Sequence, residues 1–207
     1  MNRIKVQHII VCTHFCYSLY YIQEVKKLND QQTPTKIIEL NLQQVAKTSL
    51  IWMIGFSVLL LLVNSFVHQD FSYDFSWLGL LLFITGYIVL IVLHEVTHLI
   101  GFVVVGKVPW RSLDYGFNLK LGIAYATTNK AVQNKAIRKV LILPFWVTGV
   151  LPSVIAIAIN SPLLALLGAW LIAGAVGDFA MIKELRKVND SAWIKDDPAL
   201  PKLYVFE

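Results

Sequence analysis

Four long apolar segments dominate the pattern of hydrophobic and polar positions along the chain. The first and third carry no charged residue, the second is uncharged until His94, and the fourth holds one charge, Asp178. A helix needs about 20 mostly apolar residues to cross a bilayer, and each segment has that length. The segments are residues 49–67, 75–106, 140–159 and 163–182. We therefore predict four transmembrane helices, referred to below as spans one to four.

The polar connection between spans two and three shows a different period. In DYGFNLKLGIAYATT, residues 114–128, apolar side chains occupy alternate positions, which is typical of a β-strand. The alternating residues are Phe117, Leu119, Leu121, Ile123 and Tyr125. The end of the chain, KLYVFE, also has strand character. We expect an all-α membrane fold with a small cytoplasmic strand or hairpin between spans two and three, and one more short strand at the end.

The distribution of basic residues predicts the orientation of the spans. All 18 Lys and Arg residues lie before span one, between spans two and three, or after span four, and none lies in residues 68–74 or 160–162. Cytoplasmic loops carry an excess of Lys and Arg, so both termini are expected in the cytoplasm of a multi-pass protein of the cell membrane. The net charge of +5 then favours contact with anionic lipid, and this orientation explains the charge without a nucleic-acid partner.

Composition excludes an ordinary soluble domain. The chain is 57% hydrophobic and only 15% charged. Soluble domains are about 25% charged, so the expected surroundings of this chain are the lipid bilayer.

A polar triplet interrupts span two. His94, Glu95 and His98 form the pattern HExxH, and residues four apart share one face of a helix. A charged residue in the middle of a transmembrane helix costs roughly 2.5–3.5 kcal/mol unless something offsets it. Two imidazoles that bind one zinc ion, with the glutamate as general base, would provide that offset.

A catalytic zinc ion usually has three protein ligands, and Asp178 is the candidate for the third. Only two acidic residues lie inside the spans, Glu95 and Asp178. Counted from the outer ends of their spans at the helical rise, His94 lies ~25 Å deep and Asp178 ~24 Å deep. A stripe of Ala169, Ala173 and Gly177 would let span four approach span two closely, although such a stripe also suits ordinary membrane packing. The alternatives for Asp178 are a salt bridge with Lys183 or a helix cap.

Three of these features together resemble a known family. HEVTH in an apolar span, a third span with two prolines, and GAVGDFAMIKEL (residues 174–185) resemble the bacterial family domain of unknown function 3267, described as zincin peptidases. The ending KDDPALPKLYVFE resembles that family too. The resemblance covers residues 36–207 as one four-span domain and leaves residues 1–35 outside as a cytoplasmic leader. The chain is also more distantly similar to site-2-type intramembrane metalloproteases.

The resemblance implies a zinc metallopeptidase. His94, His98 and Asp178 would be the zinc ligands and Glu95 the general base. The expected substrates are peptide bonds of membrane or membrane-associated proteins near the cytoplasmic face. Alternating Phe117, Leu119 and Leu121 would offer an edge strand to an extended substrate peptide.

Two other functions stay open at this point. One is a catalytically silent metal-binding membrane regulator, since a fold does not guarantee an activity. The other is a small metal-ion transporter, because intramembrane His and acidic residues also mark ion pathways. A Glu95→Gln variant that keeps zinc but loses cleavage would separate the peptidase from both. Substrate identity and oligomeric state do not follow from the sequence.

The leader contains the string CTHFC, with Cys12, His14 and Cys16. A second metal site there is one interpretation, and a small strand or amphipathic stretch is the other. Three adjacent ligands rarely complete a structural zinc site, which favours the second interpretation.

Overall fold

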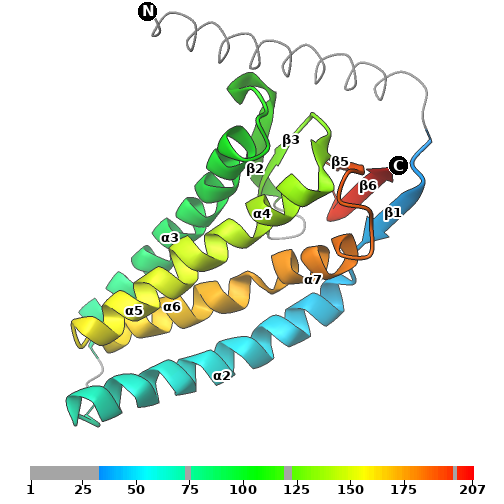
Figure 1. The fold of residues 1–207 in the computed structure, drawn as a ribbon. Coiled ribbons are helices and arrows are strands. Elements are labelled where there is room, and N and C mark those ends of the chain that lie inside the picture. Colours follow the sequence, from blue (N-terminus) through cyan, green and yellow to red (C-terminus); the bar gives the residue numbers. More distant parts are fainter. Residues whose placement is uncertain (1–32, 73–75, 119–122, 198–199) are drawn as a thin grey trace, which may run out of the picture.

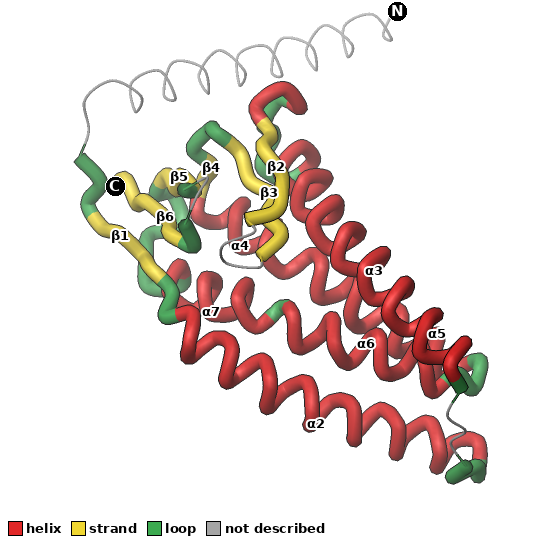
Figure 2. The backbone as a smooth tube through the Cα atoms, turned by 180° about the vertical axis from the view of Figure 1, so that it is seen from behind, coloured by secondary structure: helices red, strands yellow, loops and turns green. Residues whose placement is uncertain are grey.

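The four spans lie side by side, and the β-strands outside the spans lie together at one end of them. The computed structural model describes residues 33–72, 76–118, 123–197 and 200–207. Two views show the long helices running roughly together, with both sheets and the C-terminus at the same end (Figures 1 and 2). Cys12, His14 and Cys16 lie outside the described residues.

The first two spans are single long helices, α2 (Leu42–His68) and α3 (Trp77–Val104). Each begins where a polar side chain caps a free backbone N–H group: Asn41 accepts from Gln44, and Ser76 accepts from Gly79. Most large apolar side chains along both helices are exposed. Such surfaces suit lipid and would be unstable in water.

The third and fourth spans are interrupted helices. The third comprises α4 (Asn134–Pro144), a π-helical stretch η2 (Phe145–Val150) and α5 (Leu151–Ala158), and the fourth comprises α6 (Pro162–Gly174) and α7 (Val176–Leu185). Among the described residues, four helical segments are long and apolar enough to cross a membrane. The prediction of four apolar spans is confirmed, although the third span begins at Asn134 and not near residue 140.

A four-stranded antiparallel sheet joins the strand-bearing ends of three spans. Its order is β1-β6-β5-β4, and its strands are β1 (Lys36–Glu39), β4 (Val132–Gln133), β5 (Trp193–Asp196) and β6 (Lys202–Phe206). Strand β1 leads into α2, β4 leads into α4, and β5 and β6 follow α7. The expected strand at the chain end is β6, whereas the sheet around it was not predicted. The description of the fold as all-α with a single hairpin was therefore incomplete.

The connection between the second and third spans folds as a hairpin, as the alternating pattern indicates. A short 3-10 turn (Trp110–Ser112) leads into β2 (Leu113–Asn118), which pairs antiparallel with β3 (Ile123–Thr128). Gly116 faces Tyr125, and a Cβ atom at Gly116 would lie 2.8 Å from the Tyr125 hydroxyl oxygen. A larger residue at this position would force the Tyr125 side chain to move.

Candidate metal centre and its cavity

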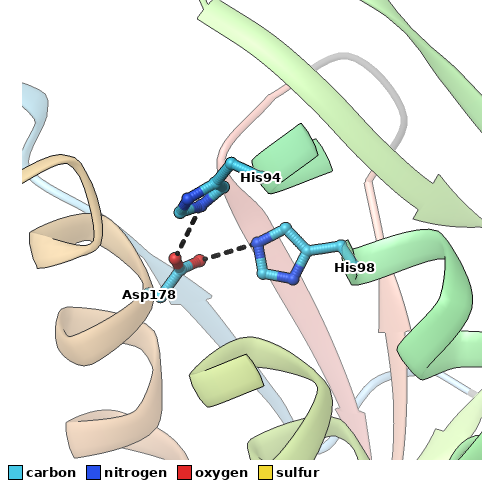
Figure 3. Close-up of side chains that lie close together, drawn as sticks. All are labelled: His94, His98 and Asp178. Atoms are coloured by element: carbon cyan, nitrogen blue, oxygen red, sulfur yellow. Dashed lines mark ion pairs between the residues drawn. The ribbon is translucent and has the colours of Figure 1, made fainter. Parts of the chain in front are cut away.

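Three side chains from two distant parts of the chain meet in the interior. His94 and His98 lie one turn apart on the same face of α3, both buried, and Asp178 lies in the first turn of α7. His94 Nε2 lies 3.3 Å from Asp178 Oδ2, and His98 Nε2 lies 3.4 Å from Asp178 Oδ1 (Figure 3). The carboxylate thus lies between the two imidazoles.

Each distance, one to each carboxylate oxygen of Asp178, is close to the separation of two neighbouring ligand atoms in a tetrahedral zinc site. Zinc binds His nitrogen and carboxylate oxygen at about 2.0–2.2 Å, so two ligand atoms at the tetrahedral angle lie roughly 3.3–3.5 Å apart. The three ligand atoms lie within 4.8 Å of one another, which makes them a group that could hold a metal ion. The donor set of two imidazoles and one carboxylate leaves a fourth position for water or substrate, as in catalytic zinc sites.

The backbone of α4 orients His98. Its Nδ1 lies 3.2 Å from the carbonyl oxygen of Val140. A carbonyl oxygen can only accept, so Nδ1 carries the proton, and in the neutral imidazole Nε2 keeps a lone pair that can bind a metal ion. The carbonyl is available because its α-helical partner would be the N–H group of residue 144, which is proline. Gly101 lets the two helices approach, since a Cβ atom there would lie 3.1 Å from Val140 Cγ1.

The π-helical stretch orients His94. Thr148 Oγ1 donates to the carbonyl oxygen of Pro144 at 2.8 Å and lies 3.3 Å from His94 Nδ1. The single hydroxyl proton is used by Pro144, so the hydroxyl oxygen accepts from His94 Nδ1–H. His94 Nε2, like His98 Nε2, is then free to bind a metal ion. π-Helical turns inside α-helices are frequent at functional sites, and this one brings Thr148 to the metal centre.

The three residues line a cavity of about 370 Å³ at the strand-bearing end of the spans. Glu95, partly buried, also lines it, as the base of an HExxH site must. Its other walls come from the start of α2, from β3, and from the segment that forms β5 and β6. A cavity of this volume lies within the range of small-molecule binding sites.

The hairpin contributes to the cavity through β3 more than through β2. Asn118 and the residues Ala124 to Thr127 line the cavity. Phe117, an expected substrate contact, lies on β2 with 57% of its side chain exposed and is not among the lining residues. Leu119 and Leu121, the other two expected contacts, lie outside the described residues.

The alternative roles of Asp178 and of the small-residue stripe can be compared with the structure. The ion pairs that Asp178 makes with described residues go to His94 and His98, not to Lys183. Gly177, the last residue of the stripe, lies against Val45 of α2, where a Cβ atom would be 4.0 Å from Val45 Cγ1. At this position the stripe therefore packs on the first span and not on the second.

Sequence reasoning missed three contributors to the site: the Val140 carbonyl, Thr148 and Asp196. Pro144 in an apolar span was a signal for the first, because a proline leaves the carbonyl four residues earlier without its usual donor. Nothing local marked Thr148, whose position depends on the π-helical stretch. Asp196 comes from a strand that follows the spans, and only the sheet brings it to the cavity.

A comparison with models of known protein families shows which family the chain belongs to. The model described as "Putative zincin peptidase", domain of unknown function 3267, matches residues 87–193, just over half of the 207 residues. The chain belongs to this family. The region matched to the zincin family contains His94, Glu95, His98 and Asp178, and it leaves out α2 and β6. No curated protein and no solved structure matches the chain.

Proposed function

We propose that this protein is a zinc-dependent membrane-embedded metallopeptidase that hydrolyses peptide bonds of membrane or membrane-associated proteins. The observation that carries the proposal is the meeting of His94 and His98 with Asp178 at distances that suit zinc ligands, inside a chain of the zincin family. His94 Nε2, His98 Nε2 and the Asp178 carboxylate would hold the ion. A zinc ion in such a site supplies a Lewis acid that polarises the scissile carbonyl group and activates water.

Glu95 performs the proton transfers in this proposal. It takes a proton from the attacking water and gives it to the nitrogen of the leaving amine. Its position next to His94 in the chain and in the wall of the same cavity supports this role. Thr148 and the Val140 carbonyl keep the imidazoles in the protonation state in which Nε2 can bind the metal.

The substrate would bind as an extended strand along the cavity side of β3. Residues Ala124 to Thr127 line the cavity, and β2 pairs with β3 from the other side. An extended peptide that adds to a free strand edge makes main-chain hydrogen bonds and exposes its amide groups. We place the cavity near the cytoplasmic face of the cell membrane, with both termini in the cytoplasm, because the Lys and Arg residues cluster on the strand-bearing side of the spans.

Cleavage by purified protein in lipid nanodiscs tests the proposal. Fluorescently labelled casein serves as a generic unfolded substrate, and zinc content is measured on the same samples. We expect the wild type to cleave casein and Glu95→Gln to lose about 10²–10⁴-fold in rate while it keeps its zinc. Glu184→Gln, a change of the same kind on a partly exposed glutamate that pairs with Lys187 outside the cavity, should leave the rate unchanged. A Glu95→Gln variant that cleaves casein as fast as the wild type contradicts the proposal.

A further inference from the structure

A second polar group lies in the wall of the cavity, away from the HExxH motif. Asp196 on β5 and Thr127 on β3 both line the cavity, and Thr127 Oγ1 donates a hydrogen bond to Asp196 Oδ2 at 2.6 Å. Thr127 is buried and Asp196 is partly buried. This bond links the hairpin that follows α3 to the four-stranded sheet, 69 residues away along the chain. Asp196 also lies beyond the region matched to the zincin family.

The Asp196 carboxylate is partly shielded from water and forms no ion pair with a described residue. Burial raises its pKa to about 6, and the hydrogen bonds from Thr127 and from the backbone N–H of Asp197 only partly oppose this shift. No ion pair between described residues includes Asp196. No Lys or Arg is found among the described residues that line the cavity, although the chain contains 18 of them. A desolvated carboxylate without a counter-ion is costly, and a bound cation would offset that cost.

We infer that Asp196 is a specificity-determining residue that binds a cationic group of the substrate peptide, a Lys or Arg side chain or a free α-amino group. The inference rests on the proposed function and names its substrate class. Thr127 is a positioning residue in this arrangement. Its hydroxyl group holds one carboxylate oxygen of Asp196 beside β3, where the substrate strand would lie.

Electrostatics favours the same substrates. A carboxylate offers about four acceptor positions, and one hydroxyl and one backbone N–H group leave room for an ammonium or guanidinium donor. Charge-assisted hydrogen bonds of this kind are roughly twice as strong as neutral ones. An acidic substrate residue at the same place would meet a like charge and would be rejected.

Peptide retention tests the inference without requiring cleavage. The Glu95→Gln protein, loaded with zinc in nanodiscs, is incubated with a random peptide library, and retained peptides are sequenced by mass spectrometry. We expect Lys and Arg to be enriched about tenfold at one position, and the additional change Asp196→Asn to abolish this enrichment. Asparagine can still accept from Thr127, so this variant removes the charge and keeps the hydrogen bond.

Two matched variants separate charge from structure. Asp190→Asn changes the net charge equally, but Asp190 pairs with Arg138 and is not among the residues that line the cavity, so the enrichment should persist. Thr127→Val removes the hydrogen bond and leaves the Asp196 charge, so basic peptides should still be enriched, at a less sharply defined position. A library with acetylated amino termini tells a side chain from an α-amino group as the bound cation.

The inference is overturned if the Glu95→Gln protein retains no excess of basic peptides, or if the excess survives Asp196→Asn. Failure of the proposed function is seen separately, as a wild type that does not cleave casein.

Discussion

The side chain of His98 and the backbone of Val140 form a contact that depends on a proline. His98 Nδ1 lies 3.2 Å from the Val140 carbonyl oxygen, which is free because residue 144 has no N–H group to bind it. The candidate metal centre therefore draws on three spans: the second gives the imidazoles, the fourth gives the carboxylate, and the third contacts both imidazoles.

Restoring the missing N–H group should weaken metal binding. In Pro144→Ala, the new N–H group competes with His98 for the Val140 carbonyl, so we expect zinc affinity to fall by about tenfold or more. Competition with a chelator of known affinity measures the change. Pro152→Ala, in the same span, is the control and should bind zinc like the wild type. Equal affinities for the wild type and Pro144→Ala would refute the role of the freed carbonyl.

The hydroxyl group of Thr148 should matter in the same way for His94. Thr148→Val keeps the shape of the side chain but removes the acceptor for Nδ1–H, and loss of such a partner typically costs 10–100-fold in metal affinity. Thr148→Ser should restore most of the affinity. Ser153→Ala removes a buried hydroxyl that bonds only to Gly149 within the third span, and it should leave zinc affinity intact. The prediction fails if Thr148→Val and Ser153→Ala behave alike.

Asp196→Asn should stabilise the folded protein at neutral pH and not at acidic pH. Burial raises the pKa of Asp196 from 3.8 to about 6 in the folded protein. Below about pH 4 the carboxyl group is protonated in both states, so the shift has no effect. Between about pH 4 and 6 the folded protein holds a proton that the unfolded chain releases, so wild-type stability falls as pH rises.

We expect the melting temperature of Asp196→Asn to exceed that of the wild type by about 2–4 °C at pH 7.5, the shift that ~1 kcal/mol gives in a chain of this size. The difference should shrink towards zero at pH 4. Thermal unfolding in detergent followed by intrinsic fluorescence gives both values. A constant difference across this pH range would show that the carboxyl pKa is not raised.

Close packing between the third and fourth spans should depend on Gly168. A Cβ atom there would collide with Ser153 Oγ, lie 3.0 Å from the Ser153 backbone nitrogen and lie 3.2 Å from the Gly149 carbonyl oxygen. Overpacking of this kind typically costs 1–3 kcal/mol, so Gly168→Ala should lower the free energy of unfolding by about that amount. Gly55→Ala, inside α2 and with no atom within 4 Å of the new methyl group, should leave the free energy of unfolding unchanged or raise it by up to about 1 kcal/mol. Unfolding in mixed SDS micelles compares the two, and equal stabilities would contradict the packing.

Most of the correct predictions came from local periodicity and from the length of the apolar segments. The spacing of His94 and His98 places both on one helix face wherever that helix lies, and the apolar segments define the spans. The depth count paired His94 with Asp178 because the span ends share a common reference, the membrane surface. The structure brings these side chains within 3.3 Å of each other.

What could not be predicted depends on contacts between distant parts of the chain. Strand β1 pairs with β6, with Lys36 opposite Val205. Each strand is so short that its sequence does not indicate which strand it pairs with. The alternation around Phe117 continues through both strands of the hairpin, so it could not show that β3, and not β2, lines the cavity. Asp196 lies on β5, which pairs with β6 and places Asp196 opposite Leu203, so its position at the cavity depends on another strand pairing in the same sheet.

X-ray absorption at the zinc edge of the purified wild-type protein shows directly whether His94, His98 and Asp178 bind zinc. We expect about one zinc ion per chain with four light ligands at ~2.0–2.2 Å, two of them imidazole nitrogens. Replacing His94, His98 or Asp178 with alanine should empty the site, while His68→Ala should leave the spectrum unchanged, because His68 contacts the Ile157 carbonyl oxygen elsewhere in the fold. Protein without zinc, or a zinc spectrum that survives all three substitutions, would show that these residues do not form a zinc site.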